Sequence, residues 1–117
     1  MDKNIFKVKG TYVNGQWFNS KNTYEVFNPS NGEKLSDVPI SDKKELELAV
    51  ESAKKAQAIW SKTSLIERVK CLEELSKKIL EKEEEFALID SYDSGNALTG
   101  MRKDVKETVN NLSLIHI

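Results

Sequence analysis

The sequence has few cysteines, few histidines and no long apolar run, and each shortage excludes a class of protein. Among 117 residues there is one cysteine, so no disulfide forms within the chain, and a reducing cytoplasmic compartment is expected. No apolar run approaches the roughly 20 residues of a membrane span, and the start, MDKNIFKVKG, lacks the apolar core of a secretory signal. Lysine and arginine (18) balance aspartate and glutamate (19), which favours neither nucleic acid nor an anionic membrane. We expect a soluble, helix-rich chain with one modest core.

Residues that carry chemistry are equally scarce. The five glycines are scattered, with no G-x-G-x-x-G and no phosphate-binding loop. Cys71 lies within an expected helix, far in sequence from the single histidine, His116. We therefore expect Cys71 to be a small apolar packing residue and not a nucleophile. Lys54-Lys55 and Lys77-Lys78 are interleaved with acids and are expected to face solvent.

One pair of carboxylates raises the question of an acid–base site. Asp90 and Asp93 stand three residues apart in the segment FALIDSYDSGN, close enough on a helix to perturb each other's pKa if both are buried. No nucleophile or metal partner lies near them in sequence. We interpret the pair as the end of a helix, with one carboxylate in water and the other helping to close the helix; an active site is the alternative.

The first forty residues are expected to be extended. Asn14-Gly15 stands between the β-formers Tyr12-Val13 and Trp17-Phe18, and Asn-Gly supplies the positive φ angles of a type I′ hairpin turn. Trp17 is expected to be a packing anchor, as is Trp60 further on. The later elements expected in this region are a strand at Tyr24 to Phe27, its end at Asn28-Pro29, a turn at Asn31-Gly32 and a strand at Leu35 to Ile40.

Two helices with capping boxes follow, one from Asp42 with Glu45 and one from Ser64 with Glu67. Each carries an apolar stripe at helical spacing. The first stripe is Leu46, Ala49, Val50, Ala53, Ala56 and Trp60; the second is Ile66, Val69, Leu72, Leu75 and Ile79, with Leu65 and Leu80 beside it. The link between the helices is short, so they are expected to form an antiparallel pair.

A third helix is expected from near Glu83 to Gly95, because the acidic run EKEEE suits a helix N-terminus and glycine suits a helix end. The run itself is interpreted as a solvated junction. A fourth helix is expected over Arg102 to Asn111. The apolar side of the third helix is expected to consist of Phe86, Ile89 and Tyr92.

Taken in order, these segments resemble the N-terminal part of the aldehyde dehydrogenase superfamily. That family has a V-N-G-x-W hairpin, an N-P-x-x-G-E turn, an A-V-x-x-A-x-x-A helix ending in Trp, an Arg-led helix, and a third helix reading L-A-x-x-x-x-x-D-x-G-K. The matching positions are Val13 to Trp17, Asn28 to Glu33, Ala49 to Trp60, Arg68, and Ala87 to Asn96. Asn96 replaces the family's usual lysine, which bears on the subfamily.

The resemblance implies an α/β fold for the intact family. This chain is expected to supply an N-terminal β-hairpin plus short strands, followed by three to four α-helices. The implied protein is an NAD(P)-dependent oxidoreductase that converts an aldehyde into a carboxylic acid. It is expected to be cytoplasmic and homo-oligomeric, with the hairpin at subunit contacts, and to bind neither nucleic acid nor a membrane.

The family's catalytic cysteine, glutamate base, oxyanion-hole asparagine and NAD or NADP site lie beyond the matching segment. No catalytic, cofactor-binding or metal residue is therefore assigned, and this chain alone is expected to bind no cofactor. Glu107 is the one residue that the resemblance brings near the substrate funnel. Neither the aldehyde nor the choice between NAD and NADP is readable from these residues.

The expected organisation is an N-terminal part of an aldehyde dehydrogenase domain over residues 1–111, with strands in 1–40 and helices in 41–111. The uncharged end LSLIHI, residues 112–117, resembles translated sequencing-adapter sequence and is interpreted as an artefactual tail; a genuine terminal strand is the alternative. A different reading of the whole chain is a complete helical-hairpin interaction module without enzymatic activity. Exposed Trp17, Trp60 and helix stripes would favour the enzyme, and a monomer that unfolds cooperatively would favour the module.

Overall fold

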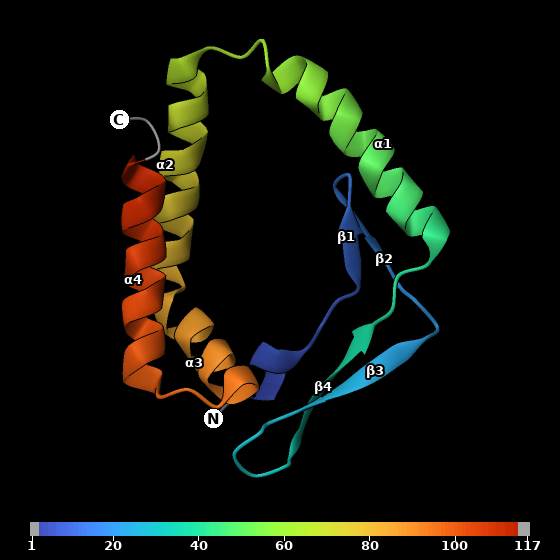
Figure 1. Ribbon diagram of the computed structural model, residues 1–117, viewed down its shortest axis with the longest axis vertical. Helices are drawn as coiled ribbons and strands as arrows, with labels where there is room; N and C mark the ends of the chain where they lie inside the picture. The colour runs from blue at the N-terminus through green and yellow to red at the C-terminus, as the bar shows by residue number, and fades with distance from the viewer. Residues whose placement is uncertain (1–2, 115–117) are drawn as a thin grey trace. The chain divides into compact units, whose positions relative to one another are not determined.

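The computed structural model describes residues 3–114, in which two β-hairpins precede four α-helices (Figure 1). The predicted order of hairpin, short strands and three to four helices is confirmed. The elements before the helices are η1 (Lys3–Phe6, a 3-10 helix), β1 (Thr11–Val13), β2 (Gln16–Phe18), β3 (Thr23–Phe27) and β4 (Lys34–Pro39). The helices are α1 (Lys43–Trp60), α2 (Leu65–Glu81), α3 (Glu83–Ser94) and α4 (Leu98–Leu114).

The described residues group into two compact units. Unit 1 consists of residues 3–27 and 34–62, which hold the four strands and α1. Unit 2 consists of residues 28–33 and 63–114, which hold the turn of the second hairpin together with α2, α3 and α4. The grouping of residues 1–111 as one part of a larger domain stays a prediction.

The first hairpin has the turn that its sequence predicts. Asn14 and Gly15 both have positive φ, 49° and 78°, and Val13 pairs with Gln16 across the turn. Side chains alternate between the two faces of this hairpin. Val13 is buried on one face, and α1 packs against β1. On the other face the rings of Tyr12 and Trp17 lie 4.9 Å apart, and both side chains are about half exposed.

The second hairpin is closed by Asn28, a buried polar residue whose hydrogen bonds stay inside the turn. Its backbone N–H donates to the Glu33 carbonyl (2.8 Å), and its carbonyl accepts from the Gly32 N–H (2.8 Å). Its side-chain Oδ1 accepts from the Ser30 N–H (2.8 Å), an Asx turn. Gly32 has a φ of 72°. The predicted strand end and second turn are therefore confirmed, and burial of Asn28 carries no unsatisfied polar group.

Both predicted capping boxes are present. The Glu45 N–H donates to Asp42 Oδ1 (2.9 Å), and the Asp42 N–H donates to Glu45 Oε2 (3.0 Å). The same exchange joins Ser64 and Glu67 at the start of α2, at 3.3 and 3.2 Å. Each box satisfies backbone N–H groups that the first helical turn leaves without partners.

In unit 2, α4 lies along α2 and also packs against α3 (Figure 1). The buried side chains here are Ala87 of α3, Val105 of α4 and Ser76 of α2, whose hydroxyl donates to the Val109 carbonyl (3.4 Å). Helix α2 packs against α4 and α3, which follow it. The pairing of α2 with α1, which belongs to unit 1, stays a prediction. A short link brings two helix ends together but does not set which faces meet.

The predicted apolar faces of α2 and α3 are confirmed in part. On α2, Val69, Leu72 and Ile79 are half-buried on the side of the buried Ser76, whereas Ile66 and Leu75 are exposed. On α3, Ile89 and Tyr92 are half-buried. On α3 Ala87 is fully buried, whereas Phe86 is exposed. Hydrophobicity alone placed the larger residues inside, but close helix packing prefers small side chains where backbones approach.

Of two predicted helix boundaries, one is confirmed and the other is wrong. The predicted end of α3 at Gly95 is confirmed, with a φ of 76°. The predicted start of the fourth helix at Arg102 is wrong, because α4 begins at Leu98 and has Gly100 in its first turn. Glycine is a poor helix former. Gly100 therefore gave no indication that the helix begins before Arg102.

The chain end is helical as far as it is described. Because α4 continues to Leu114, the alternative of a terminal strand is wrong for residues 112–114. Residues 115–117 lie outside the described residues. The interpretation of 112–117 as an artefactual tail stays a prediction.

Candidate functional site

Asp90 and Asp93 do not form an active site within the described residues. Both are exposed, and neither carboxylate has a hydrogen bond or ion pair within residues 3–114. The helix is instead closed by serines: Ser94 Oγ donates to the Asp90 carbonyl (2.6 Å) and Ser91 Oγ donates to the Asn96 carbonyl (2.7 Å). The interpretation as a helix end is right, but the closing side chains were assigned wrongly.

Cys71 is exposed on α2, so the expectation of a packed apolar residue is wrong. It faces away from the buried side of the helix, which is centred on Ser76. His116 lies outside the described residues. Residues 3–114 hold no group of three or more histidine, cysteine, aspartate or glutamate side chains able to bind a metal ion.

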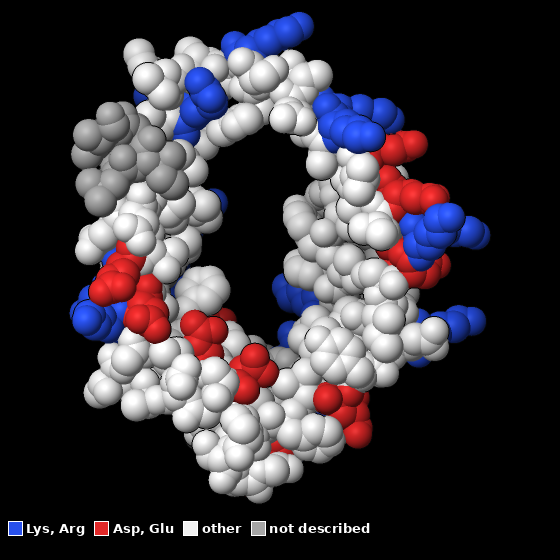
Figure 2. All heavy atoms as spheres, viewed as in Figure 1, with Lys and Arg blue, Asp and Glu red and all other residues white. Residues whose placement is uncertain are grey.

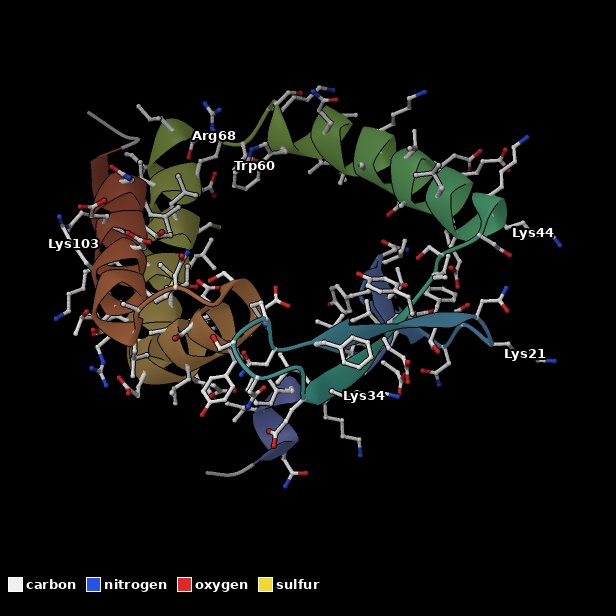
Figure 3. The ribbon with its side chains drawn as sticks, turned by 60° about the horizontal axis from the view of Figure 1, so that its bottom comes forward. Lys21, Lys34, Lys44, Trp60, Arg68 and Lys103 are labelled. Carbon is white, nitrogen blue, oxygen red and sulfur yellow. The ribbon has the colours of Figure 1, made fainter. Side chains whose placement is uncertain are left out.

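The other charged residues that the sequence singled out lie on the surface. Lys54-Lys55 and Lys77-Lys78 are exposed, as predicted. Glu107 is exposed on α4, 3.8 Å from the Lys103 ammonium, which points away from α2 (Figure 3). It lines neither of the grooves described below, so its position near a substrate funnel stays a prediction.

The acidic run at the start of α3 is more than a solvated junction. Arg102 of α4 forms a bidentate ion pair with Glu84, from Nε to Oε2 (2.8 Å) and from Nη2 to Oε1 (2.6 Å). Lys106, one helical turn later, lies 3.4 Å from Glu83. The hydrogen bond from Arg102 lowers the pKa of Glu84 below its usual 4.5. These pairs fix α3 against α4, and only the fold reveals them, since the partners lie 18 or more residues apart in sequence.

Acid is expected to destabilise unit 2 through Glu67 and Glu84. The hydrogen bond from the Ser64 hydroxyl, with that from the Ser64 backbone, lowers the pKa of Glu67 below 4.5, and Arg102 does the same for Glu84. Each contribution is present above the unfolded pKa near 4.5 and is lost as pH falls through the lower folded pKa. Thermal unfolding midpoints measured from pH 7 to about pH 3 should fall less steeply in Glu67→Gln and Glu84→Gln.

The matched control for this titration is Glu73→Gln, an exposed residue of α2. It should leave the pH dependence of the midpoint unchanged. If Glu73→Gln flattens the curve as much as Glu84→Gln does, the acid sensitivity does not come from the capping box and the bidentate pair.

In unit 1, an open groove runs along β4, lined by η1, the segment after it and the start of β4. Two lysines line it, Lys7 and Lys34. The Lys34 ammonium lies against the hairpin, where it is engaged by Glu25 of β3 (2.7 Å) and Asp37 of β4 (2.8 Å). The hydrogen bonds from Asp37 and Glu25 raise the pKa of Lys34 above 10.5. Because both carboxylates already neutralise this ammonium, Lys34 is not free for an anionic ligand.

A second groove in unit 1 lies between the first hairpin and α1. Its wall on α1 is formed by Leu48, Glu51, Ser52, Lys55, Ala56 and Ile59, and Asn14 of the hairpin turn forms the other side. Among the described residues, neither cysteine nor histidine lines this groove.

Arg68 is singled out by the sequence, and in the described part of the structure one of its side-chain donors lacks a hydrogen-bond acceptor. It lies in the first turns of α2 (Figure 3), and its Nε is buried with no hydrogen-bond acceptor among residues 3–114. A buried guanidinium N–H without an acceptor is unfavourable.

The described residues do not fit a nicotinamide dinucleotide. Such a site needs a glycine-rich turn that lets the backbone approach a pyrophosphate at a helix N-terminus. Gly15 and Gly32 lie in hairpin turns and Gly95 ends α3, and the N-termini of α1 and α2 are closed by their own capping boxes. No catalytic step through NAD(P) is therefore derived for this chain.

Three comparisons with known proteins agree on the family. The model of the aldehyde dehydrogenase family matches residues 17–116. Malonate-semialdehyde dehydrogenase 1 of Shouchella clausii is 37% identical over 110 residues, covering 92% of this chain and 22% of that protein. Malonate-semialdehyde dehydrogenase of Bacillus pumilus is 30% identical over 111 residues, covering 93% and 23%. The chain belongs to the aldehyde dehydrogenase family.

Solved structures of the family contain the same fold. Betaine aldehyde dehydrogenase of Staphylococcus aureus, crystallised with NAD⁺, matches with a TM-score of 0.85 at 28% identity, over 91% of this chain and 22% of that one. HpcC of Thermus thermophilus matches with a TM-score of 0.91 over 97% of this chain and 23% of its own, at 22% identity. The chain thus spans less than a quarter of the length of these relatives.

The alternative of a helical-hairpin interaction module is not favoured. The family model that matches residues 17–116 is that of an enzyme family. Trp17 and Trp60 are 54% and 44% exposed, as expected for one part of a larger enzyme, so the prediction that both are packing anchors is not met within the described residues. None of the helices in residues 3–114 has the length and apolar character of a membrane span.

Proposed function

We propose that this chain is the N-terminal part of an NAD(P)-dependent aldehyde dehydrogenase, which oxidises an aldehyde to a carboxylic acid. The observation that carries the proposal is the family match over residues 17–116, together with a fold match that covers nearly the whole chain. The catalytic cysteine, the base and the NAD(P) site belong to segments beyond this one. We also propose a cytoplasmic, homo-oligomeric enzyme, consistent with a single cysteine and balanced charge.

The role of this segment in the proposed enzyme is structural. Its ionisable groups are engaged in caps and ion pairs or face solvent, and among the described residues neither cysteine nor histidine lines the two grooves. We accordingly expect the 117-residue chain alone to oxidise no aldehyde with either NAD⁺ or NADP⁺. Absorbance of the reduced nicotinamide would reveal turnover, and a rate above the uncatalysed background would contradict this expectation.

A chimera tests whether the segment belongs to a working enzyme. Residues 1–111 of this chain replace the aligned segment of the Shouchella clausii enzyme, which is 37% identical over 110 residues. We expect the chimera to oxidise malonate semialdehyde, whereas the same enzyme with the segment deleted should not. A chimera that unfolds cooperatively, yet shows no more activity than the deletion, would contradict the proposed function.

A further inference from the structure

The sequence holds two Asn-Gly pairs, Asn14-Gly15 and Asn31-Gly32, and each lies in the turn of one of the two hairpins. Asparagine before glycine is chemically labile, because glycine has no side chain to hinder attack of its nitrogen on the asparagine amide. The other asparagines precede residues with a side chain, and Asn28 precedes a proline, which has no N–H. The two pairs are therefore the candidates for deamidation, and the fold distinguishes them.

In the second hairpin both reacting groups are engaged in hydrogen bonds. The Gly32 N–H donates to the Asn28 carbonyl (2.8 Å), and Oδ1 of Asn31 accepts from the Glu33 N–H (3.0 Å). Attack of the Gly32 nitrogen on Cγ of Asn31 requires the peptide plane and the side chain to rotate toward each other. Because that rotation breaks both hydrogen bonds, the turn raises the barrier to the reaction.

In the first hairpin neither reacting group is engaged in this way. Among residues 3–114, neither the Gly15 N–H nor the Asn14 side chain has a hydrogen-bond partner. Strand pairing closes at Val13 and Gln16, so the peptide that joins Asn14 to Gly15 lies beyond the last paired residues. Asn14 is exposed. The strands β1 and β2 have three residues each, and so short a hairpin opens locally at low cost in free energy.

Neighbouring charges do not distinguish the two sites. The groove beside Asn14 is lined by both Glu51 and Lys55 of α1, and Figure 2 shows lysine and acidic side chains interspersed along that helix. The two residues after Gly32 are likewise an acid and a lysine. Since charges of both signs lie near each asparagine, the difference between the sites is the hydrogen bonding of their turns.

We propose that Asn14 is a site of spontaneous deamidation in this chain, and that the second turn protects Asn31. The Gly15 nitrogen forms a bond to Cγ of Asn14, the bond from Cγ to the side-chain nitrogen breaks, and ammonia leaves with the proton of the Gly15 N–H. Water then opens the resulting succinimide ring. Opening at Cγ gives aspartate, and opening at the former backbone carbonyl gives isoaspartate. The inference does not depend on the proposed function.

The two products have different consequences for the first hairpin. Aspartate keeps the turn, because Asp-Gly suits the same positive φ angles as Asn-Gly. Isoaspartate leads the main chain through Cβ and Cγ, which adds one carbon atom to the turn and misaligns Val13 with Gln16. The burial of Val13 and the contact of α1 with β1 depend on that alignment. Deamidation of Asn14 therefore loosens this hairpin with time.

Peptide mapping of the full 117-residue chain tests the proposal. The folded chain is incubated in mildly alkaline buffer, and samples are digested with trypsin at intervals. Cleavage after Lys9, Lys21 and Lys34 places Asn14 and Asn31 in separate peptides, in which mass spectrometry measures conversion of the amide to a carboxyl group. Asn14 should be converted about tenfold faster than Asn31, because two hydrogen bonds must break at Asn31.

The matched control is the same chain unfolded in concentrated urea, which keeps both Asn-Gly pairs and removes both turns. The rates at Asn14 and Asn31 should then become similar. A variant, Asn28→Ala, tests the protection directly, since it removes the side-chain acceptor of the Ser30 N–H. It should raise the rate at Asn31 and leave the rate at Asn14 unchanged.

Each outcome decides the inference. Faster conversion of Asn14 in the folded chain, with the difference lost in urea, supports it. Conversion of Asn31 as fast as Asn14 in the folded chain overturns it. A preference for Asn14 that persists in urea also overturns it, because local sequence and not the fold would then be the cause. Absence of conversion at Asn14 in the folded chain, while the unfolded chain is converted, overturns it as well.

Discussion

Replacing Ala87 with leucine is expected to lower the free energy of unfolding by about 1–3 kcal/mol. Ala87 is 0% exposed and lies on α3, which packs against α4. Packed protein interiors have few voids, so an isobutyl group in place of a methyl group must either push the two helices apart or adopt a strained rotamer. Thermal or urea unfolding of the chain, followed by far-ultraviolet circular dichroism, measures the change.

The control for Ala87→Leu is Ala58→Leu, which makes the same chemical change on the exposed surface of α1. Alanine and leucine both favour helix, so this variant should change stability by no more than about 0.5 kcal/mol. Equal unfolding midpoints for the two variants would mean that Ala87 is not tightly enclosed, and that the interface of α3 with α4 is looser than the structure shows.

Replacing Gly95 with alanine is expected to destabilise unit 2 by two separate effects. Gly95 has a φ of 76°, and the left-handed conformation is unfavourable for alanine by about 1–2 kcal/mol. A Cβ at this position would also lie 2.9 Å from Cγ of Pro29. The turn of residues 28–33 would have to shift away from the end of α3. The loss should therefore exceed what backbone conformation alone produces.

Two other glycines separate these effects. Gly32 has a φ of 72° but open space around a Cβ, so Gly32→Ala should show the conformational loss without the clash. Gly100 lies inside α4, has no such φ, and also faces open space, so Gly100→Ala should stabilise the chain by about 0.5–1 kcal/mol. The expected order of stability is Gly100→Ala, wild type, Gly32→Ala, Gly95→Ala, and a different order in urea unfolding would contradict the assignment.

The local features of the fold were predictable because their chemistry lies within a few residues. Asn14-Gly15 specifies its own turn through positive φ, and Asp42 and Ser64 each stand three residues before the glutamate that completes their capping box. Gly95 ends α3 for a similar reason. Each of these signals needs no knowledge of what packs against the segment.

The failures concern partners that lie far apart in sequence. Ser76 and Ala87 are buried, whereas Ile66 and Phe86 are exposed, because of the faces that α2 and α3 turn toward α4. The apolar periodicity of α2 and α3 does not indicate which face that is. The pairing of Arg102 with Glu84 likewise exists only after α4 has folded back onto α3. The location of the catalytic residues beyond the matching segment is what the resemblance implies, and it stays a prediction.

The turn at residues 28–33 belongs to unit 2, although the strands on both sides of it belong to unit 1. The backbone therefore crosses between the units three times, after residues 27, 33 and 62. A truncated protein ending at Lys62 keeps this turn without the helices it is grouped with, and one beginning at Thr63 leaves Gly95 without Pro29. No single cleavage of the backbone releases either unit intact, so a single crossover between related genes at any of these three points mixes the two parents within one unit.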